Sequence, residues 1–242
     1  MIKLFRHIRR TLINQNNMGK YFKYAIGEIL LVVIGILIAL QINNWNEKRK
    51  LKAEEKEVIQ QLILDFSQNK KALDYFLLRY ENSHKVAKVT LRHTGPKVAI
   101  PSDKIFDSIL RINTPKVQLM YTSKMTKSAV NLELLTNKDL RQLIVTYQLG
   151  FDSYKTVEDN LHELTYRQRK IHQKYMSLVS DIKNEEFSAF RNDTLGFLRD
   201  REFQNITVDK RWNTDEALYY LNGIEEQNDS IIRTLKKELE KF

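Results

Sequence analysis

The sequence predicts an all-α protein in which one N-terminal transmembrane helix is followed by an elongated antiparallel bundle of long helices. Residues 29–40 form a run of twelve apolar residues. Over most of the remaining chain, apolar residues recur at helical spacing. The 242 residues include only 7 Gly and 3 Pro, too few for the many tight turns of a β-sandwich or barrel.

Residues 24–44 are expected to span the membrane. Aromatic and basic residues flank this segment as anchors for the two interfaces: Lys20, Tyr21, Lys23, Tyr24 and Trp45. A helix from Tyr24 to Trp45 is about 31 Å long, close to the hydrocarbon thickness of about 30 Å. A buried core helix would not explain a run that is apolar on every face and has aromatic and basic residues at its ends, and a cleaved signal peptide would end in a small-x-small pair that is missing here. An uncleaved signal anchor is therefore favoured.

The basic excess lies mainly ahead of this segment. The chain has a formal charge of +10, and residues 1–23 carry six basic residues and no acid. Within about 20 residues of the span, both sides carry five basic residues, so the short acid-free tail decides the orientation. We expect a single-pass protein of the inner membrane, with residues 1–23 in the cytoplasm and residues 45–242 in the periplasm. Residues 2–13 fit either an interfacial amphipathic helix or a disordered basic tail.

Two features inside the span suggest contacts within the membrane. Gly27, Gly35 and Ala39 lie on one stripe of the helix, and the pair Gly35 and Ala39 has the small-xxx-small spacing that lets two helices approach closely. Glu28 is an acid near the end of the span, where it either reaches the interface or contacts a partner subunit. Helix self-association through this stripe is one prediction from the pattern.

The first bundle helix is expected over residues 47–92, continuing directly from the span. Its apolar stripe repeats every seven residues, as in coiled coils: Ile59, Phe66, Leu73, Tyr80 and Ala87. Residues 93–135 contain all three prolines and are expected to be irregular with short helices. One of these short helices should begin at Ser102.

Two further long helices complete the predicted bundle. The first covers residues 137–179, with Gly150 as its one weak point. A polar break near residues 181–186 is followed by a less regular helical stretch to Asn205. The final helix is expected over residues 214–241.

No constellation of chemically reactive residues stands out. The chain has no Cys, which excludes disulfides, thiolate metal sites and a catalytic thiol. No two of the five His have i,i+4 spacing, and Asp159 with His162 supplies only half of a di-metal helix motif. Phosphate-binding and nucleophile-elbow motifs are missing from the sequence. We therefore predict no catalytic, cofactor-binding or metal-binding residue and no cofactor.

Three segments carry a resemblance to a known group of proteins. Residues 25–47, AIGEILLVVIGILIALQINNWNE, resemble the signature of a family of uncharacterised single-span membrane proteins of gram-negative bacteria. Residues 134–147 and 202–205 are similar to its weaker downstream motifs. The family has no established activity, so the resemblance implies architecture and membrane location without a mechanism.

These observations favour a membrane-anchored helical interaction module facing the periplasm, acting as a scaffold, an assembly factor or a ligand sensor. The expected partners are the lipid bilayer and a protein partner or second copy, bound through the membrane helix or the bundle. An enzyme whose site is dispersed in sequence is the first alternative. A cytoplasm-facing nucleic-acid binder is the weakest, because residues 44–242 hold 34 basic and 29 acidic side chains, which makes them nearly balanced in charge.

Overall fold

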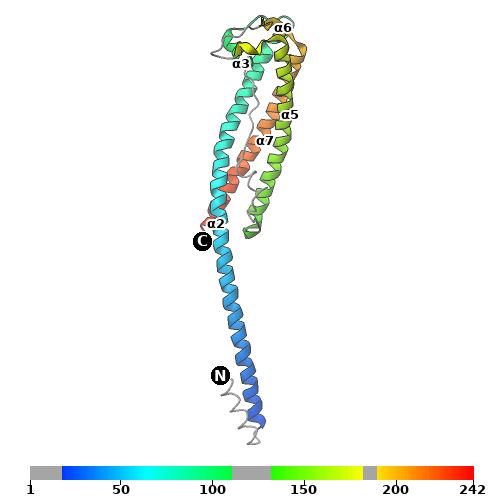
Figure 1. Cartoon of the computed structure of the whole chain (residues 1–242). Coiled ribbons are helices and arrows are strands. Elements are labelled where there is room, and N and C mark those ends of the chain that lie inside the picture. Colours follow the sequence, from blue (N-terminus) through cyan, green and yellow to red (C-terminus); the bar gives the residue numbers. More distant parts are fainter. Residues whose placement is uncertain (1–17, 111–131, 182–189) are drawn as a thin grey trace. The chain divides into compact units, whose positions relative to one another are not determined.

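The computed structural model in Figure 1 describes residues 18–110, 132–181 and 190–242, which are helical and contain no strand. The helices, in chain order, are α2 (Met18–Arg92), α3 (Asp103–Leu110), α5 (Lys138–Tyr175), α6 (Thr194–Arg199) and α7 (Arg201–Leu239), with short 3-10 turns at Leu132–Leu134 and Leu178–Asp181. The all-α class is thus confirmed over the described residues. The chain forms two compact units, residues 1–55 and 56–242.

Helix α2 runs without interruption from the apolar segment into the first bundle helix, as predicted. Residues 47–92 contain neither Gly nor Pro, so nothing breaks the helix there. The chain turns at Gly95, whose φ of +135° is a conformation that only glycine adopts readily. The backbone N–H of Gly95 donates to the carbonyl of Leu198, 2.9 Å away, which ties this turn to α6.

Helix α3 starts directly after Ser102, where the sequence places a helix start. The N–H of Phe106 donates to the Ser102 carbonyl over 2.9 Å. Residues 111–131, the other half of the predicted irregular region, lie outside the described residues, as do residues 1–17 with the expected interfacial segment. The polar break expected near residues 181–186 falls almost entirely in residues 182–189, which are also outside them.

Helix α5 begins next to residue 137, as predicted, and Asn137 caps it. Asn137 accepts a hydrogen bond from the N–H of Leu140 through its side chain, at 3.0 Å. Gly150 does not interrupt the helix. A Cβ at this position would lie 3.6 Å from a side-chain atom of Ile224 and of Gln227, so α5 and α7 pass close together there.

The predicted boundary of the last helix was wrong. Helix α7 begins at Arg201 rather than near Thr214, and the break expected after Asn205 does not exist. Asp200 sets the start, because its carboxylate accepts from the N–H of Phe203 at 2.9 Å. Buried contacts of Phe203 and Ile206 hold the β-branched stretch that follows in helical form, outweighing its modest helix propensity.

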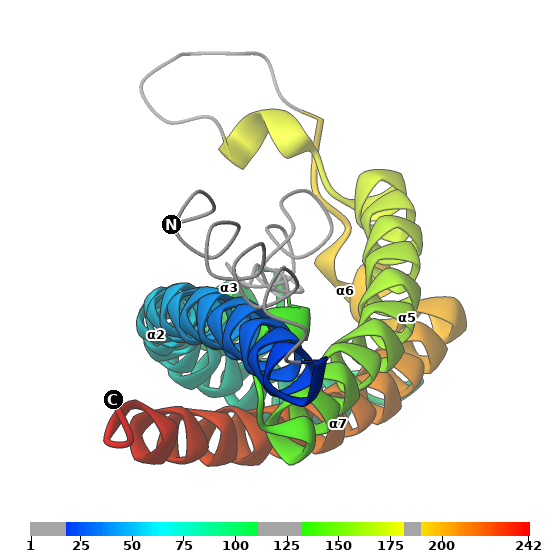
Figure 2. The same ribbon diagram turned by 90° about the horizontal axis from the view of Figure 1, so that it is seen from below.

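Within residues 56–242, three long helices pack side by side, and they are not all antiparallel. Figures 1 and 2 show α7 beside α5 and running in the opposite direction. Contacts of α2 with α7 are also antiparallel, since Phe66 meets Asn228 and His84 meets Asp215. Helices α2 and α5, however, run in the same direction. Asn69 meets Tyr147 and Tyr80 meets Tyr154, so the two helices advance along the bundle together.

The bundle has two apolar clusters. The central core joins α2, α5 and α7 and contains the predicted stripe residues Ile59, Phe66, Leu73 and Tyr80. The Phe66 and Tyr147 rings meet edge to face at 5.2 Å in this core. The end core joins α3, α5, α6 and α7 around Phe197 and Phe203, whose ring centres are 4.1 Å apart.

Candidate functional site

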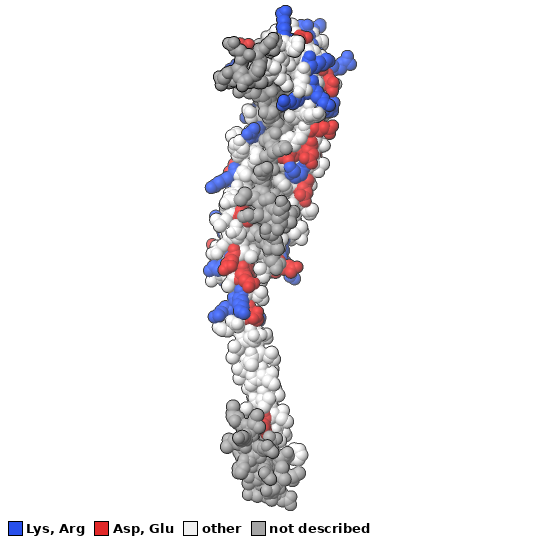
Figure 3. Space-filling view, in the orientation of Figure 1, with Lys and Arg blue, Asp and Glu red and all other residues white. Residues whose placement is uncertain are grey.

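The apolar segment of α2, in the unit formed by residues 1–55, is one candidate functional feature. Phe22–Arg92 is the one helix among the described residues that is long and apolar enough to cross a membrane, and none of its most apolar window is buried. Ile29, Leu37 and Ile42 are each more than half exposed. Figure 3 shows this stretch as uncharged surface over nearly its whole length. Length, composition and exposure together fit a helix that could span a bilayer.

The small-residue stripe predicted within this segment packs against no other helix in the described part of this unit. A Cβ at Gly27 or Gly35 would meet no atom within 4 Å, and Ala39 is exposed. Glu28 is half-buried. Any helix packed on this stripe would therefore come from another chain or another part of this one.

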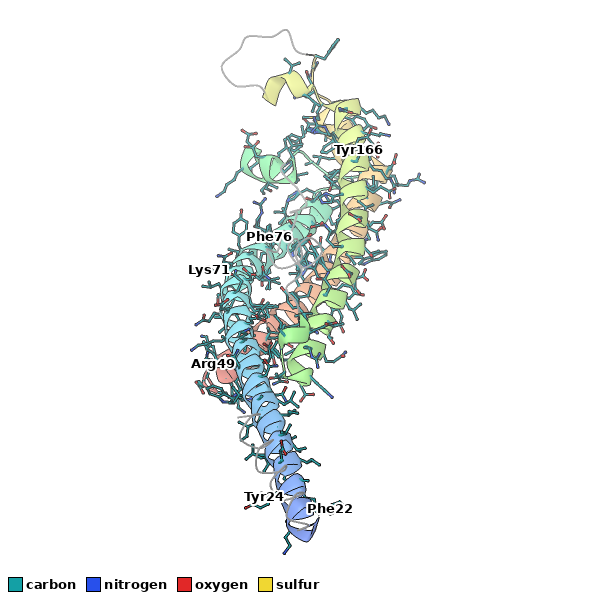
Figure 4. All side chains as sticks on the ribbon, turned by 60° about the horizontal axis from the view of Figure 1, so that its bottom comes forward. Phe22, Tyr24, Arg49, Lys71, Phe76 and Tyr166 are labelled. Carbon is teal, nitrogen blue, oxygen red and sulfur yellow. The ribbon has the colours of Figure 1, made fainter. Side chains whose placement is uncertain are left out.

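The predicted interface anchors are exposed where the structure describes them. Lys23 and Tyr24 are exposed at one end of the apolar segment, and Figure 4 shows Tyr24 and Phe22 projecting from opposite sides of α2. At the other end, the Arg49 guanidinium lies 5.4 Å from the ring centre of Trp45, a cation–π contact. The side chains of Lys20 and Tyr21 lie outside the described residues.

A buried polar network crosses the middle of the bundle. Tyr80 on α2 and Tyr154 on α5 share a hydrogen bond of 2.9 Å, and the Tyr154 hydroxyl donates to Glu158 at 2.8 Å. Glu158 is 1% exposed and also accepts from the ammonium of Lys155. Burial raises the pKa of Tyr80 to about 12 and raises the pKa of Tyr154 as well, so both hydroxyls stay protonated at neutral pH. The network therefore suits structural cross-linking rather than nucleophilic chemistry.

Two buried asparagines join α2 to the other long helices. Asn228 of α7 donates to the carbonyl of Phe66 at 3.1 Å, and Asn69 of α2 donates to the Tyr147 hydroxyl at 3.4 Å. Both are fully buried at positions that apolar residues would otherwise fill. Polar residues at such positions fix the register of packed helices.

A pocket opens where α3, α5 and α6 meet beside the end core. Its cavity volume is about 120 Å³. Ile109 and Leu110 of α3 and Phe197 of α6 form an apolar wall. The remaining lining residues come from one stretch of α5, and they form a polar wall: Thr165, Gln168, Arg169 and His172.

The polar wall is backed by a buried lysine. Lys210 of α7 is 4% exposed, and its ammonium donates to Gln168 Oε1 at 2.9 Å. Burial lowers the pKa of Lys210 to about 8, because the interior solvates the charge less well than water does. A lysine held by a neutral amide is unusual, since buried charges are normally paired with an opposite charge.

The sequence reasoning missed this pocket and this lysine. Gln168 and Arg169 belong to the basic stretch Tyr166–Lys170, which reads as a solvated helix face, and Figure 4 shows Tyr166 on α5. Only its spacing could have indicated that Gln168 is buried: it lies four residues after the buried Leu164, on the stripe of α5 that faces the core.

Candidate metal ligands do not gather in the described residues. None of the groups of His, Asp and Glu there contains three or more members placed to hold an ion. His84 is paired with Asp215 across α2 and α7, and His172 lies against the Phe197 ring, with centres 5.6 Å apart. Asp159 and His162 remain without the second motif that a di-metal site needs.

Fold and site together define a helical protein with one candidate membrane span and a bundle that carries a small amphiphilic pocket. Residues 28–123 match the model of a family of unknown function (DUF6090). The match confirms the expected resemblance to an uncharacterised family, while residues 134–147 and 202–205 lie beyond the matched part. No curated protein matches the chain, and no solved structure does.

Proposed function

We propose that this chain is a single-pass inner-membrane protein that presents its helical bundle in the periplasm as an interaction module. The role would be that of a scaffold, an assembly factor or a ligand sensor. The observation that supports it most is the exposed apolar segment of α2, because so large an apolar surface is unfavourable in water and favourable in lipid. The aromatic and basic residues at its ends fit the two interfaces.

The bundle supports the interaction role more than the alternatives. Its long helices bury apolar stripes, and its internal polar groups are mostly engaged in cross-links between helices. On the face shown in Figure 3, basic and acidic side chains lie side by side, which does not favour nucleic acid as a partner. An enzyme would need a nucleophile and a general base held in one pocket. Among the described residues that line the pocket above, only Thr165 and His172 are of these types, and none of the lining residues is acidic.

Fractionation of cells tests the membrane anchor. The wild-type chain should remain with membranes after a carbonate wash, whereas the double substitution Ile34→Lys and Leu37→Lys should release it. The control carries Leu64→Lys, which charges another exposed apolar residue of α2 outside the span. If the double variant stays in the membrane fraction, or the wild type is washed off, the anchor is elsewhere or missing.

Crosslinking in native membranes, followed by affinity purification, tests the interaction role. We expect one stoichiometric protein partner or a second copy of the chain to be recovered with the wild type. If neither a partner nor a second copy is recovered from membranes in which the chain is folded and abundant, the interaction role is contradicted and the enzyme alternative is favoured.

A further inference from the structure

The pocket at α3, α5 and α6 combines polar side chains of α5 with apolar side chains of α3 and α6. Arg169 is exposed and has no ion pair with another described residue. Among the described residues that line the pocket, none is acidic. A ligand with a negative charge would therefore meet a guanidinium without displacing a carboxylate.

Gln168 links this wall to the positive charge behind it. Its Oε1 accepts from Lys210, so the NH2 group at the end of the same side chain points away from the lysine. Gln168 lines the pocket and is 8% exposed, which places that NH2 group in partly dehydrated surroundings. Lys210 has no carboxylate partner among the described residues, and Gln168 alone separates it from the pocket lining, so an anion bound beside Gln168 would bring a counter-charge toward the buried ammonium.

The size and the apolar wall limit the kind of anion. The volume of about 120 Å³ is near the 150 Å³ of an engineered cavity that takes up benzene. Ile109, Leu110 and Phe197 offer nothing to a fully hydrated oxyanion, but they can bury a short apolar body. A carboxylate attached to such a body satisfies both walls at once.

We propose that the pocket formed by α3, α5 and α6 binds a small organic carboxylate, whose charged group contacts Gln168 and Arg169 and whose apolar part lies against Phe197. This site does not depend on the membrane topology proposed above. It makes the bundle a ligand receptor, whichever side of the membrane it faces.

Benzoate is a suitable probe, and benzamide is its neutral counterpart of the same shape. Titration of the full chain in detergent micelles, followed by calorimetry at pH 7, should show benzoate binding at least about tenfold more tightly than benzamide. Inorganic phosphate, which has the charge without the apolar body, should bind more weakly than benzoate. Benzoate binding no tighter than benzamide, phosphate binding tighter than benzoate, or no benzoate binding up to millimolar concentration would each overturn the proposal.

Two substitutions locate the site. Arg169→Gln should weaken benzoate binding about tenfold or more, while Arg167→Gln, the same change two residues earlier and outside the pocket, should leave it within about twofold. Lys210→Met should also weaken benzoate binding without unfolding the bundle, which circular dichroism checks. Equal binding by the Arg169→Gln and Arg167→Gln proteins would overturn the assignment.

Discussion

Replacing Lys210 with Met should stabilise the bundle at neutral pH. The lysine is buried, and its pKa falls from 10.5 in the unfolded chain to about 8 in the folded one. At about 1.36 kcal/mol per pKa unit, holding the charge inside costs up to about 3 kcal/mol at pH 7. Loss of the hydrogen bond to Gln168 offsets about 1 kcal/mol of the gain. We therefore expect a net increase of about 2 kcal/mol in the free energy of unfolding.

The pH dependence gives a second signature of the same lysine. Between pH 8 and 10.5, the unfolded chain binds more protons at this residue than the folded chain, so the wild type should gain stability as pH rises. Below pH 8 both states are protonated, and the cost is constant. The window to use is pH 8 to 10, because above it the unfolded tyrosines begin to ionise, whereas the raised pKa of about 12 keeps Tyr80 protonated in the folded chain. Ionisation in the unfolded state alone lowers stability, so it opposes the lysine effect.

Urea unfolding of the full chain in micelles, followed by circular dichroism at several pH values, measures both effects. Lys71→Met on α2 is the matched control, because Lys71 is exposed and Figure 4 shows it on the outside of the helix. It should change stability by less than about 0.5 kcal/mol. If Lys210→Met destabilises the bundle at pH 7, or if the wild type gains no stability between pH 8 and 10, Lys210 is not a buried charge without a counter-charge.

Three further outcomes follow from other contacts. Hydrogen bonds from Lys241 and Asn137 lower the pKa of Glu238 in the folded chain. Ionised Glu238 therefore stabilises the fold above the unfolded pKa of 4.5, and this stabilisation is lost as the pH falls through the lower pKa of the folded state. Glu238→Gln should thus cost about 1 kcal/mol at pH 7, with the gap to wild type closing in acid; a gap that does not change with pH would contradict this. Gly150→Ala should raise the thermal midpoint and stabilise by up to about 1 kcal/mol, since its Cβ has room beside α7; a lowered midpoint would show that α7 is too close. Gly35→Ile should abolish self-association of the span in a membrane two-hybrid assay, and unchanged association would show that the small-residue stripe is not the contact.

The long helices could be predicted from the sequence because their stripes are regular. Ile59, Phe66, Leu73, Tyr80 and Ala87 are spaced by seven and are all buried. Local signals also gave the starts of α3 after Ser102 and α5 after Asn137. The physical causes are core-facing stripes and, for α5, the Asn137 side-chain cap, and each lies within a few residues of the element it determines.

The start of α7 and the polar residues of the interior could not be predicted, because they depend on contacts between residues far apart in the sequence. Residues 206–213 look like a break because they mix β-branched and charged residues, and only their contacts with α5 and α6 make them helical. The pairing of Lys210 with Gln168 joins residues 42 positions apart, and the pocket needs side chains from three helices. The parallel course of α2 and α5 was equally hidden, because two amphipathic stripes carry no mark of their relative direction.

The absence of cysteine offers a direct test of the proposed topology. Single cysteines introduced at Lys3, in the basic tail, and at Lys71, on the exposed face of the bundle, can be treated in intact spheroplasts with a membrane-impermeant maleimide. We expect labelling at position 71 without detergent, and labelling at position 3 only after the membrane is dissolved. Labelling at position 3 with protection at position 71 would reverse the orientation. Labelling of neither position before lysis would place both in the cytoplasm, so that the chain would not span the membrane.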